Sequence, residues 1–393
     1  MSDQEDPEDV DDIDADDTDE QDESSSSDTE SSSQSFTPDI PFSSGAFIKG
    51  LAAGIFILCL LFGWAWLRTD DTIARQMEKL PSKTAVIDRN YNPAQKPDPK
   101  LANLPPAVDG AALVKEAQNR ERPKTALSPA PAEGLYEQTQ RGLLPVSRMT
   151  DGETPFDAYK RPYTPAAGKI PLAVVFVNVG LSKIATQAMI RDFDPNMSLV
   201  FSPYSVDTSA QAQAARDAGH EIWLSMPLEN ETYPDPDPGP RTLFINASLE
   251  QNQGRLFSTM TDLIGYVGVV TGKNHKYRPE DVDGTAFIRQ VFGRGLALVD
   301  GNTSRPFFAR EMADRNHYPY AQAQEWLNAD LRPAEIRAQL SVLPQKAVLS
   351  DNGYILFVEP TPLNLKYIKA WVRTIDKDGL ELAPLSAIAD KKS

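Results

Sequence analysis

Apolar and polar positions follow two different periods along the C-terminal part of the chain. Short apolar runs rich in β-branched residues, such as Ile170–Val179, are typical of strands buried on both faces. Between these runs, apolar residues recur every three or four positions, which indicates helices with one buried face. The expected strands are 170–179, 198–201, 220–226, 266–270, 296–300 and 354–359. The expected helices are 183–191, 209–218, 248–263, 283–292, 306–315, 333–345 and 363–376.

The order of these elements predicts an α/β fold. Strands and helices that alternate strictly form a parallel sheet with right-handed crossovers. About 220 residues and about seven strands favour a (β/α) barrel over a short open sheet. In such a barrel the chemistry takes place at the carboxyl ends of the strands, so polar residues at those ends are the candidates for a functional site.

One apolar stretch near the N-terminus has the length of a membrane span. Leu51–Leu67 runs 17 residues without a charge, and Ala46–Ile48 lengthen the stretch. A helix of about 20 residues, at about 1.5 Å per residue, crosses the apolar core of a bilayer. Trp64 and Trp66 at one end fit a membrane interface. We therefore expect a transmembrane helix at 46–67, with the membrane as a partner.

Composition divides the rest of the N-terminal part into two regions. Residues 1–45 are rich in Asp, Glu and Ser, which predicts a disordered acidic tail. The tail could dock a basic partner, be phosphorylated, or only keep the chain solvated; one hypothesis makes it the functional part, with the barrel as its anchor. Residues 68–168 carry 13 prolines, which predicts a Pro-rich tether with a short helix at 110–120. The folded domain is then expected at 169–393.

Charge and cysteine content exclude several classes of function. The acidic tail holds 17 of the 56 acidic residues, and the remaining 39 balance the 39 Lys and Arg side chains. A neutral remainder gives no broad basic surface, so nucleic acid is not an expected partner. A single Cys excludes intramolecular disulfides, zinc sites built from four cysteines and iron–sulfur clusters, and a multi-His metal centre would need nearly all three His.

Seven segments of the C-terminal part carry a resemblance to a known family. They are AVVFVNVGLS, RDAGHEIWLSMPLENE, GYVGVVTGKNH, RGLALVDGNTS, ADLRPAEIRAQLSVL, GYILFVEPTP and GLELAPLSAI. In order and spacing they resemble the divergent polysaccharide deacetylase family, over nearly all of 170–390. The resemblance implies a deformed (β/α)7 barrel with a zinc-type site at its strand ends. There a metal activates water, and an Asp takes up its proton, for hydrolysis of an N-acetyl group.

The positions that this family uses for its chemistry hold other residues here. The resemblance places the proton acceptor at Val177, which cannot accept a proton, and the metal carboxylate at Asn178, which is a neutral and weaker ligand. Three histidine positions of the family fall on Ser225, Gly272 and Glu359. We therefore expect a degenerate catalytic site that holds no metal.

Polar residues at the strand ends still predict a binding surface. They are Asn178, Glu229, Lys273, His275 and Asp300. Side chains of these types can hydrogen-bond sugar hydroxyl or amide groups. One hypothesis is a non-enzymatic protein that binds a glycan or another envelope protein and needs no cofactor. The alternative is a carbohydrate deacetylase whose zinc or similar divalent metal is held by a rearranged set of His275, Asp300 and Glu229.

The expected location follows from the apolar stretch and the resemblance. Barrels of this family are exported, which implies a bacterial inner-membrane protein with a cytosolic N-terminus and a periplasmic C-terminal domain. The Lys and Arg count alone favours the opposite orientation, because Lys49 precedes the stretch while Arg68, Arg75 and Lys79 follow it. We expect the first orientation.

Overall fold

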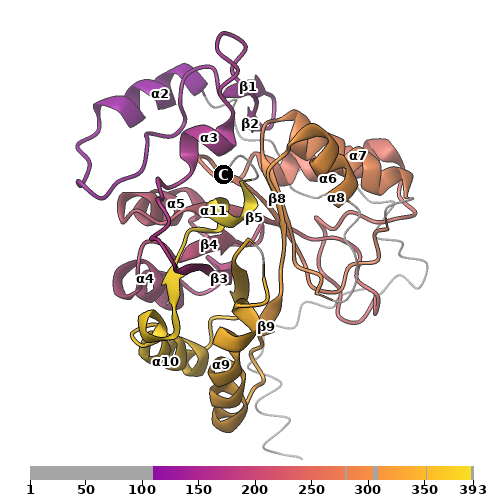
Figure 1. Ribbon diagram of the computed structural model, residues 1–393. Helices are drawn as coiled ribbons and strands as arrows, with labels where there is room; N and C mark the ends of the chain where they lie inside the picture. Colours follow the sequence, from indigo (N-terminus) through magenta and orange to yellow (C-terminus); the bar gives the residue numbers. More distant parts are fainter. Residues whose placement is uncertain (1–108, 279–280, 304–308, 351, 391–393) are drawn as a thin grey trace, which may run out of the picture. The chain divides into compact units, whose positions relative to one another are not determined.

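The alternating order of strands and helices expected from the sequence is present in the computed structural model, which describes residues 109–278, 281–303, 309–350 and 352–390 (Figure 1). The strands are β1 (Tyr136–Thr139), β2 (Gly142–Pro145), β3 (Ile170–Val179), β4 (Ser198–Phe201), β5 (Ile222–Met226), β6 (Gly268–Thr271), β7 (Ala297–Asp300), β8 (Tyr320–Gln322), β9 (Glu325–Leu327), β10 (Tyr354–Val358) and β11 (Leu380–Leu382). The helices are α2 (Gly110–Asn119), α3 (Pro155–Tyr159), α4 (Lys183–Asp192), α5 (Thr208–Asp217), α6 (Leu249–Met260), α7 (Val282–Gly293), α8 (Arg310–Asn316), α9 (Pro333–Ala347), α10 (Pro362–Trp371), the 3-10 helix η3 (Ile375–Asp378) and α11 (Leu385–Ala389).

One parallel sheet forms the centre of the domain. Its strand order is β8-β7-β6-β5-β4-β3-β10-β9, and β11 pairs with the start of β3. Strands β8 and β9 are two halves of one extended segment, of which β8 pairs with β7 and β9 pairs with β10. Only Ala323 and Gln324 lie between them, and their N–H groups donate to the carbonyl oxygens of Asp300 and Ile355. The sheet therefore curls until this segment borders both edges, which confirms the α/β fold and fits the expected deformed barrel.

Alternate side chains of the strands enter two different cores. Along β3, the even-numbered residues 172–176 belong to a cluster that also contains Leu256, Ile288 and Ile368 from the helices. The odd-numbered residues 173–177 belong to a second cluster, built mainly from strand residues. Because successive side chains of a strand point to opposite faces, the first cluster fills the space between sheet and helices, and the second fills the inside of the curled sheet.

Residues 109–168 belong to the folded domain, so the predicted tether and its boundary at 168 are wrong in this part. Helix α2 confirms the short helix expected at 110–120. Strands β1 and β2 pair as an antiparallel hairpin, and Phe156 and Tyr159 of α3 join the inner core together with Leu385 of α11. The prolines of this stretch include Pro155, which begins α3, a position where a missing N–H group costs nothing.

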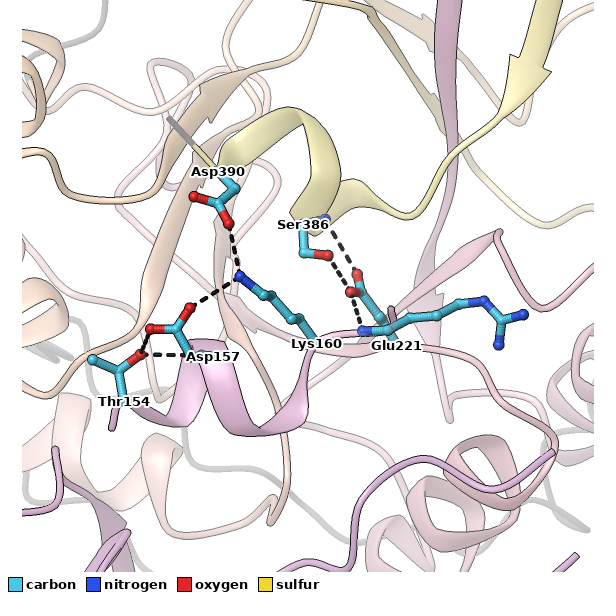
Figure 2. Close-up of polar contacts among 7 residues, drawn as sticks. Thr154, Asp157, Lys160, Glu221, Ser386 and Asp390 are labelled. Atoms are coloured by element: carbon cyan, nitrogen blue, oxygen red, sulfur yellow. Dashed lines mark hydrogen bonds and ion pairs between the residues drawn. The ribbon is translucent and has the colours of Figure 1, made fainter. Parts of the chain in front are cut away.

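A buried carboxyl group joins this N-terminal region to the C-terminal helix (Figure 2). Glu221, just before β5, is fully buried. Its oxygens accept hydrogen bonds from the backbone N–H of Arg161 at 2.7 Å and from both the backbone N–H, at 3.2 Å, and the hydroxyl of Ser386. Burial raises the pKa of Glu221 above its usual range, although these donors oppose the shift. The junction lies at the amino ends of the strands. In a (β/α) barrel this end contributes to stability, whereas catalysis takes place at the other end.

Two basic residues strengthen the same junction. The Nζ of Lys160 lies 2.9 Å from Asp157 of α3 and 2.7 Å from Asp390, the residue after α11. Arg216 of α5 is buried and donates to the carbonyl oxygens of Ser128 and Gly265, both at 2.6 Å. Burial lowers the pKa of Arg216 to about 10. The segment that precedes β3 is therefore fixed to the barrel by charged side chains as well as by its apolar residues.

Several expectations fall outside the described residues. These are the acidic tail, the transmembrane helix at 46–67 and the tether up to residue 108. Within the described ranges, no helix has both the length and the apolar character that crossing a membrane requires. The helix expected at 363–376 ends earlier, at Trp371, and the chain forms the separate 3-10 turn η3 before β11.

Candidate functional site

Strand β3 ends in an irregular turn that exposes its last polar residue. The register with β4 shifts between Phe176 and Val179, and Asn178 has a φ of 56°, in the left-handed region. Asn tolerates this conformation better than most residues. Val177 packs in the inner core, whereas Asn178 is exposed. The expected proton-acceptor position thus holds an apolar core side chain, and the expected metal-carboxylate position holds an amide that faces solvent.

The ends of β6 and β7 hold a buried histidine and carboxylate in direct contact. The Nε2 atom of His275 lies 2.9 Å from Oδ1 of Asp300, and the two side chains are 3% and 1% exposed. The same oxygen accepts hydrogen bonds from the hydroxyl of Thr271 at 2.8 Å and from the backbone N–H of Asn302 at 3.0 Å. The structure therefore brings together two of the expected site residues, at a junction that holds the loops after β6 and β7 in place.

A second polar group lies at the ends of β6, β9 and β10. The ammonium group of Lys273 is 2.8 Å from Oδ1 of Asn328 and 3.2 Å from Oε1 of Glu359, and it lies 5.3 Å from the ring centre of Trp326. The other oxygen of Glu359 accepts the backbone N–H of Ala329 at 2.7 Å. The side chains of Lys273 and Glu359 are 37% and 22% exposed. Unlike the buried pair, this group is accessible to a ligand.

Trp326 connects the buried pair to this accessible group. Its Nε1 donates to the carbonyl oxygen of Gly301 at 2.7 Å, and its ring stacks on Phe357 at 4.8 Å between centroids. A Cβ atom at Gly301 would lie 2.3 Å from the carbonyl oxygen of Thr271 and 3.0 Å from the Trp326 ring, so only glycine fits there. The indole is fixed between strands and gives the site a rigid apolar wall.

Glu229 forms an ion pair of its own. Its Oε1 lies 2.7 Å from the ammonium group of Lys276, and its Oε2 accepts the backbone N–H of Ile245 at 3.0 Å. An isolated bridge between Asn230 and His275 brings the two loops side by side. Both oxygens of Glu229 nevertheless have other partners, namely Lys276 and the backbone of Ile245. The three residues expected to form the rearranged site thus lie in two places. His275 and Asp300 form a buried pair, and Glu229 forms a separate ion pair with Lys276.

The residues at the strand ends do not fit a zinc-type centre. In the part of the chain that the structure describes, no three His, Cys, Asp or Glu side chains are grouped so that they could hold a metal ion. Ser225 lies in β5, and a Cβ atom at Gly272 would meet no other atom within 4 Å. Glu359 is bound to Lys273 and to the backbone. An imidazole is therefore absent from each position where the resemblance implies one.

Sequence reasoning missed some partners of the expected residues. They are Lys276, Asn302 and Asn328, together with the contact of Trp326 to Lys273. Lys276 was detectable as a neighbour of His275, but Trp326 and Asn328 lie in and after a three-residue strand that has no periodic signal.

His220 is structural, because its ring nitrogens lie 2.8 and 3.3 Å from carbonyl oxygens and burial lowers its pKa.

The sequence of the barrel decides the family. A model of divergent polysaccharide deacetylases matches residues 174–389, which is more than half of the chain. The chain belongs to the divergent polysaccharide deacetylase family. The match runs from β3 to α11 and confirms the resemblance on which the site positions were assigned.

Comparison with solved structures supports the fold of this family member. The uncharacterized protein ATU2773 from Agrobacterium tumefaciens C58 is similar, with 28% identity and a TM-score of 0.57, and the match covers 63% of this chain and 99% of that protein. A mutant of BA3943, a CE4 family pseudoenzyme, matches at 10% identity and a TM-score of 0.32, over 60% of this chain and 73% of its own. The second similarity is too weak to support an inference. No curated protein matches the chain.

Proposed function

We propose that this divergent polysaccharide deacetylase is a membrane-anchored envelope protein that binds a glycan or an envelope protein and does not hydrolyse N-acetyl groups. The observation that carries the proposal is the set of residues at the strand ends. Val177 is an apolar core residue, Gly272 has no side chain, and His275 contacts Asp300 instead of standing in a metal-ligand set. Hydrolysis by this family's chemistry needs both a metal ligand set and a proton acceptor.

The accessible polar group supports the binding role. Lys273 offers an ammonium group within hydrogen-bond distance of both the carboxylate of Glu359 and the amide of Asn328. Such a cluster beside the fixed indole of Trp326 suits recognition of sugar hydroxyl and amide groups. The exposed amide of Asn178 lies at the same carboxyl end of the barrel.

The purified full-length protein should release no acetate from acetylated sugar oligomers, even with added Zn²⁺ or Co²⁺. Loss of a general base alone typically costs about 10²–10⁴ in rate, and loss of metal ligands usually costs the metal. The double variant Val177→Asp/Asn178→Asp should stay inactive, because Ser225 and Gly272 still supply no imidazole. Metal-dependent turnover in the unmodified protein that disappears in His275→Ala would overturn the proposal.

The contact between His275 and Asp300 favours one alternative, a metal-dependent carbohydrate deacetylase with a rearranged site. In that case Glu229 would have to leave Lys276 and turn to the same metal ion. The same acetate assay separates the two hypotheses, because the alternative requires turnover that depends on each of the three residues.

The proposed topology makes a separate prediction. A reporter that fluoresces only in the cytosol should be dark when fused after Ser393 and bright when fused before Met1, because a span at 46–67 with a cytosolic N-terminus would place the barrel in the periplasm. A second reporter that needs export for activity provides the matched control. The reverse pattern would contradict the proposed location and agree with the Lys and Arg count.

A further inference from the structure

Helix α9 and the two residues after it present an uncharged face to solvent, beside α10 (Figure 1). We call it the α9 face, and its exposed residues are Ala334, Ala338, Ser341, Val342, Gln345, Val348 and Leu349. These positions recur mainly at intervals of three and four, so they lie on one side of the helix. Val342, Val348 and Leu349 are 40%, 64% and 85% exposed. Apolar side chains gathered on one surface in this way mark an interaction site more often than scattered ones do.

A groove of about 450 Å³ lies beside the C-terminal half of the α9 face. Its described lining residues are Leu340, Ser341, Pro344, Gln345, Val348, Trp371, Thr374 and Asp378. Trp371, at the end of α10, is half-buried and gives the groove an aromatic wall. Pro344 has no N–H group for the carbonyl oxygen of Leu340, so α9 lacks one helical hydrogen bond beside the groove. Among these described lining residues, Asp378 alone is charged.

Two cations of α9 lie next to the α9 face, and both are held by neighbouring elements. The Nζ of Lys346 lies 2.9 Å from Oε2 of Glu325 in β9. The guanidinium group of Arg337 donates to the hydroxyl of Tyr367 in α10 at 2.8 Å. The centre of the face is left without charge, and the cores of protein interfaces are likewise poor in charged residues. The α9 face therefore favours a partner surface that is itself apolar and uncharged.

We propose that the α9 face binds the α9 face of a second copy of this chain, with a twofold axis beside Gln345. One surface carries both a protrusion, formed by Val348 and Leu349, and a recess, the groove beside Trp371. Two antiparallel α9 helices related by this axis place Leu349 of one copy opposite Ser341 of the other. Because Ser341 lines the groove, each protrusion enters the groove of the other copy, as a self-complementary twofold interface requires.

The size of the α9 face predicts a weak dimer. From Ala334 to Leu349 the face is about 22 Å long, at about 1.5 Å per residue. Two helices of this length bury less than the roughly 800 Å² per partner of a standard interface. A lipid surface is a poorer occupant, because Asp378 would meet anionic headgroups. The proposal does not depend on glycan binding, since the C-terminal half of α9 leads to the start of β10, at the end of the barrel opposite to the strand-end site.

Disulfide cross-linking of the full-length protein tests this pairing and suits a weak dimer. In a Cys59→Ser background, which removes the lone cysteine, Gln345→Cys should form disulfide-linked dimers about tenfold faster than Gln118→Cys. The reason is that the twofold axis brings the two copies of residue 345 together. Gln118 is the matched control, because it is also an exposed glutamine in a helix, α2. Equal rates for the two variants would overturn the proposal and assign the face to another occupant.

A charge at the protrusion makes the test specific. Leu349→Lys should slow the cross-linking of Gln345→Cys to the rate of the control, because an ammonium group enters an apolar groove at a high cost. A basic residue after the C-terminus of a helix is compatible with folding, so the midpoint of urea unfolding should not change. Adding Ser341→Asp, which lies opposite residue 349 in the proposed pair, should restore the faster rate. A folded Leu349→Lys variant that cross-links as fast as before, or a folded double variant that stays slow, would overturn the proposal.

Discussion

Replacing Glu221 by Ala should lower the free energy of unfolding by about 3–4 kcal/mol. The carboxyl group lies in a fully buried position and accepts from Arg161, Ser386, Ser198 and Trp223. Each buried donor that loses its acceptor costs about 1–3 kcal/mol, and a partial relaxation of the junction recovers some of this. Urea unfolding of the purified protein measures the loss.

A surface carboxylate provides the matched control for this change. Glu311→Ala removes an exposed partner of Arg315 in α8 and should change the unfolding free energy by less than about 0.5 kcal/mol. Ser386→Ala removes one hydrogen-bond donor of the junction, and its loss of unfolding free energy should lie between those of the two variants. If Glu221→Ala cost no more than Glu311→Ala, the junction between the segment before β3 and the C-terminal helix would not hold the domain together.

Replacing Asp300 by Ala should cost about 2–4 kcal/mol of unfolding free energy. One oxygen of this buried carboxylate accepts hydrogen bonds from Thr271, His275 and the backbone of Asn302, so three groups lose this acceptor. Glu359→Ala, at the same end of the barrel but partly exposed, should cost about 1 kcal/mol or less. Chemical denaturation of the three proteins gives the comparison.

Unfolding measured with and without a chelator distinguishes a structural role of Asp300 from a role as a metal ligand. We expect the unfolding free energy of the unmodified protein to be the same with and without EDTA. A loss of stability with EDTA in the unmodified protein, absent in Asp300→Ala, would mean that this carboxylate holds a metal and contributes to folding through it.

The barrel strands could be predicted because burial on both faces gives an unusual sequence. The expected bounds of β3 match the structure at both ends, and β4 does as well. The two halves of the closing segment, β8 and β9, are three residues each and carry no period, so the way in which the sheet closes could not be predicted. The folding of the segment before β3 could not be predicted, because proline content alone does not separate a tether from a folded stretch of turns and short helices.

The residues of the site could be predicted from the sequence, but not which of them contact each other. Lys273 and Glu359 both lie at predicted strand ends, but 86 positions separate them in the sequence, and only the curl of the sheet brings them together. His275 and Asp300 are likewise joined through neighbouring parallel strands. The lack of a proton acceptor at Val177 and of an imidazole at Gly272 can be seen in the sequence, because it depends on residue type rather than on distance.

The central claim is that the strand ends of this barrel hold no catalytic metal. Elemental analysis of the full-length protein, purified without chelator and dialysed against buffer containing Zn²⁺ and then against metal-free buffer, tests it most directly. We expect a Zn²⁺ content well below one per chain, and the same content in His275→Ala. About one Zn²⁺ per chain, as a closed metal site would bind, lost in His275→Ala and in Asp300→Ala, would contradict the account.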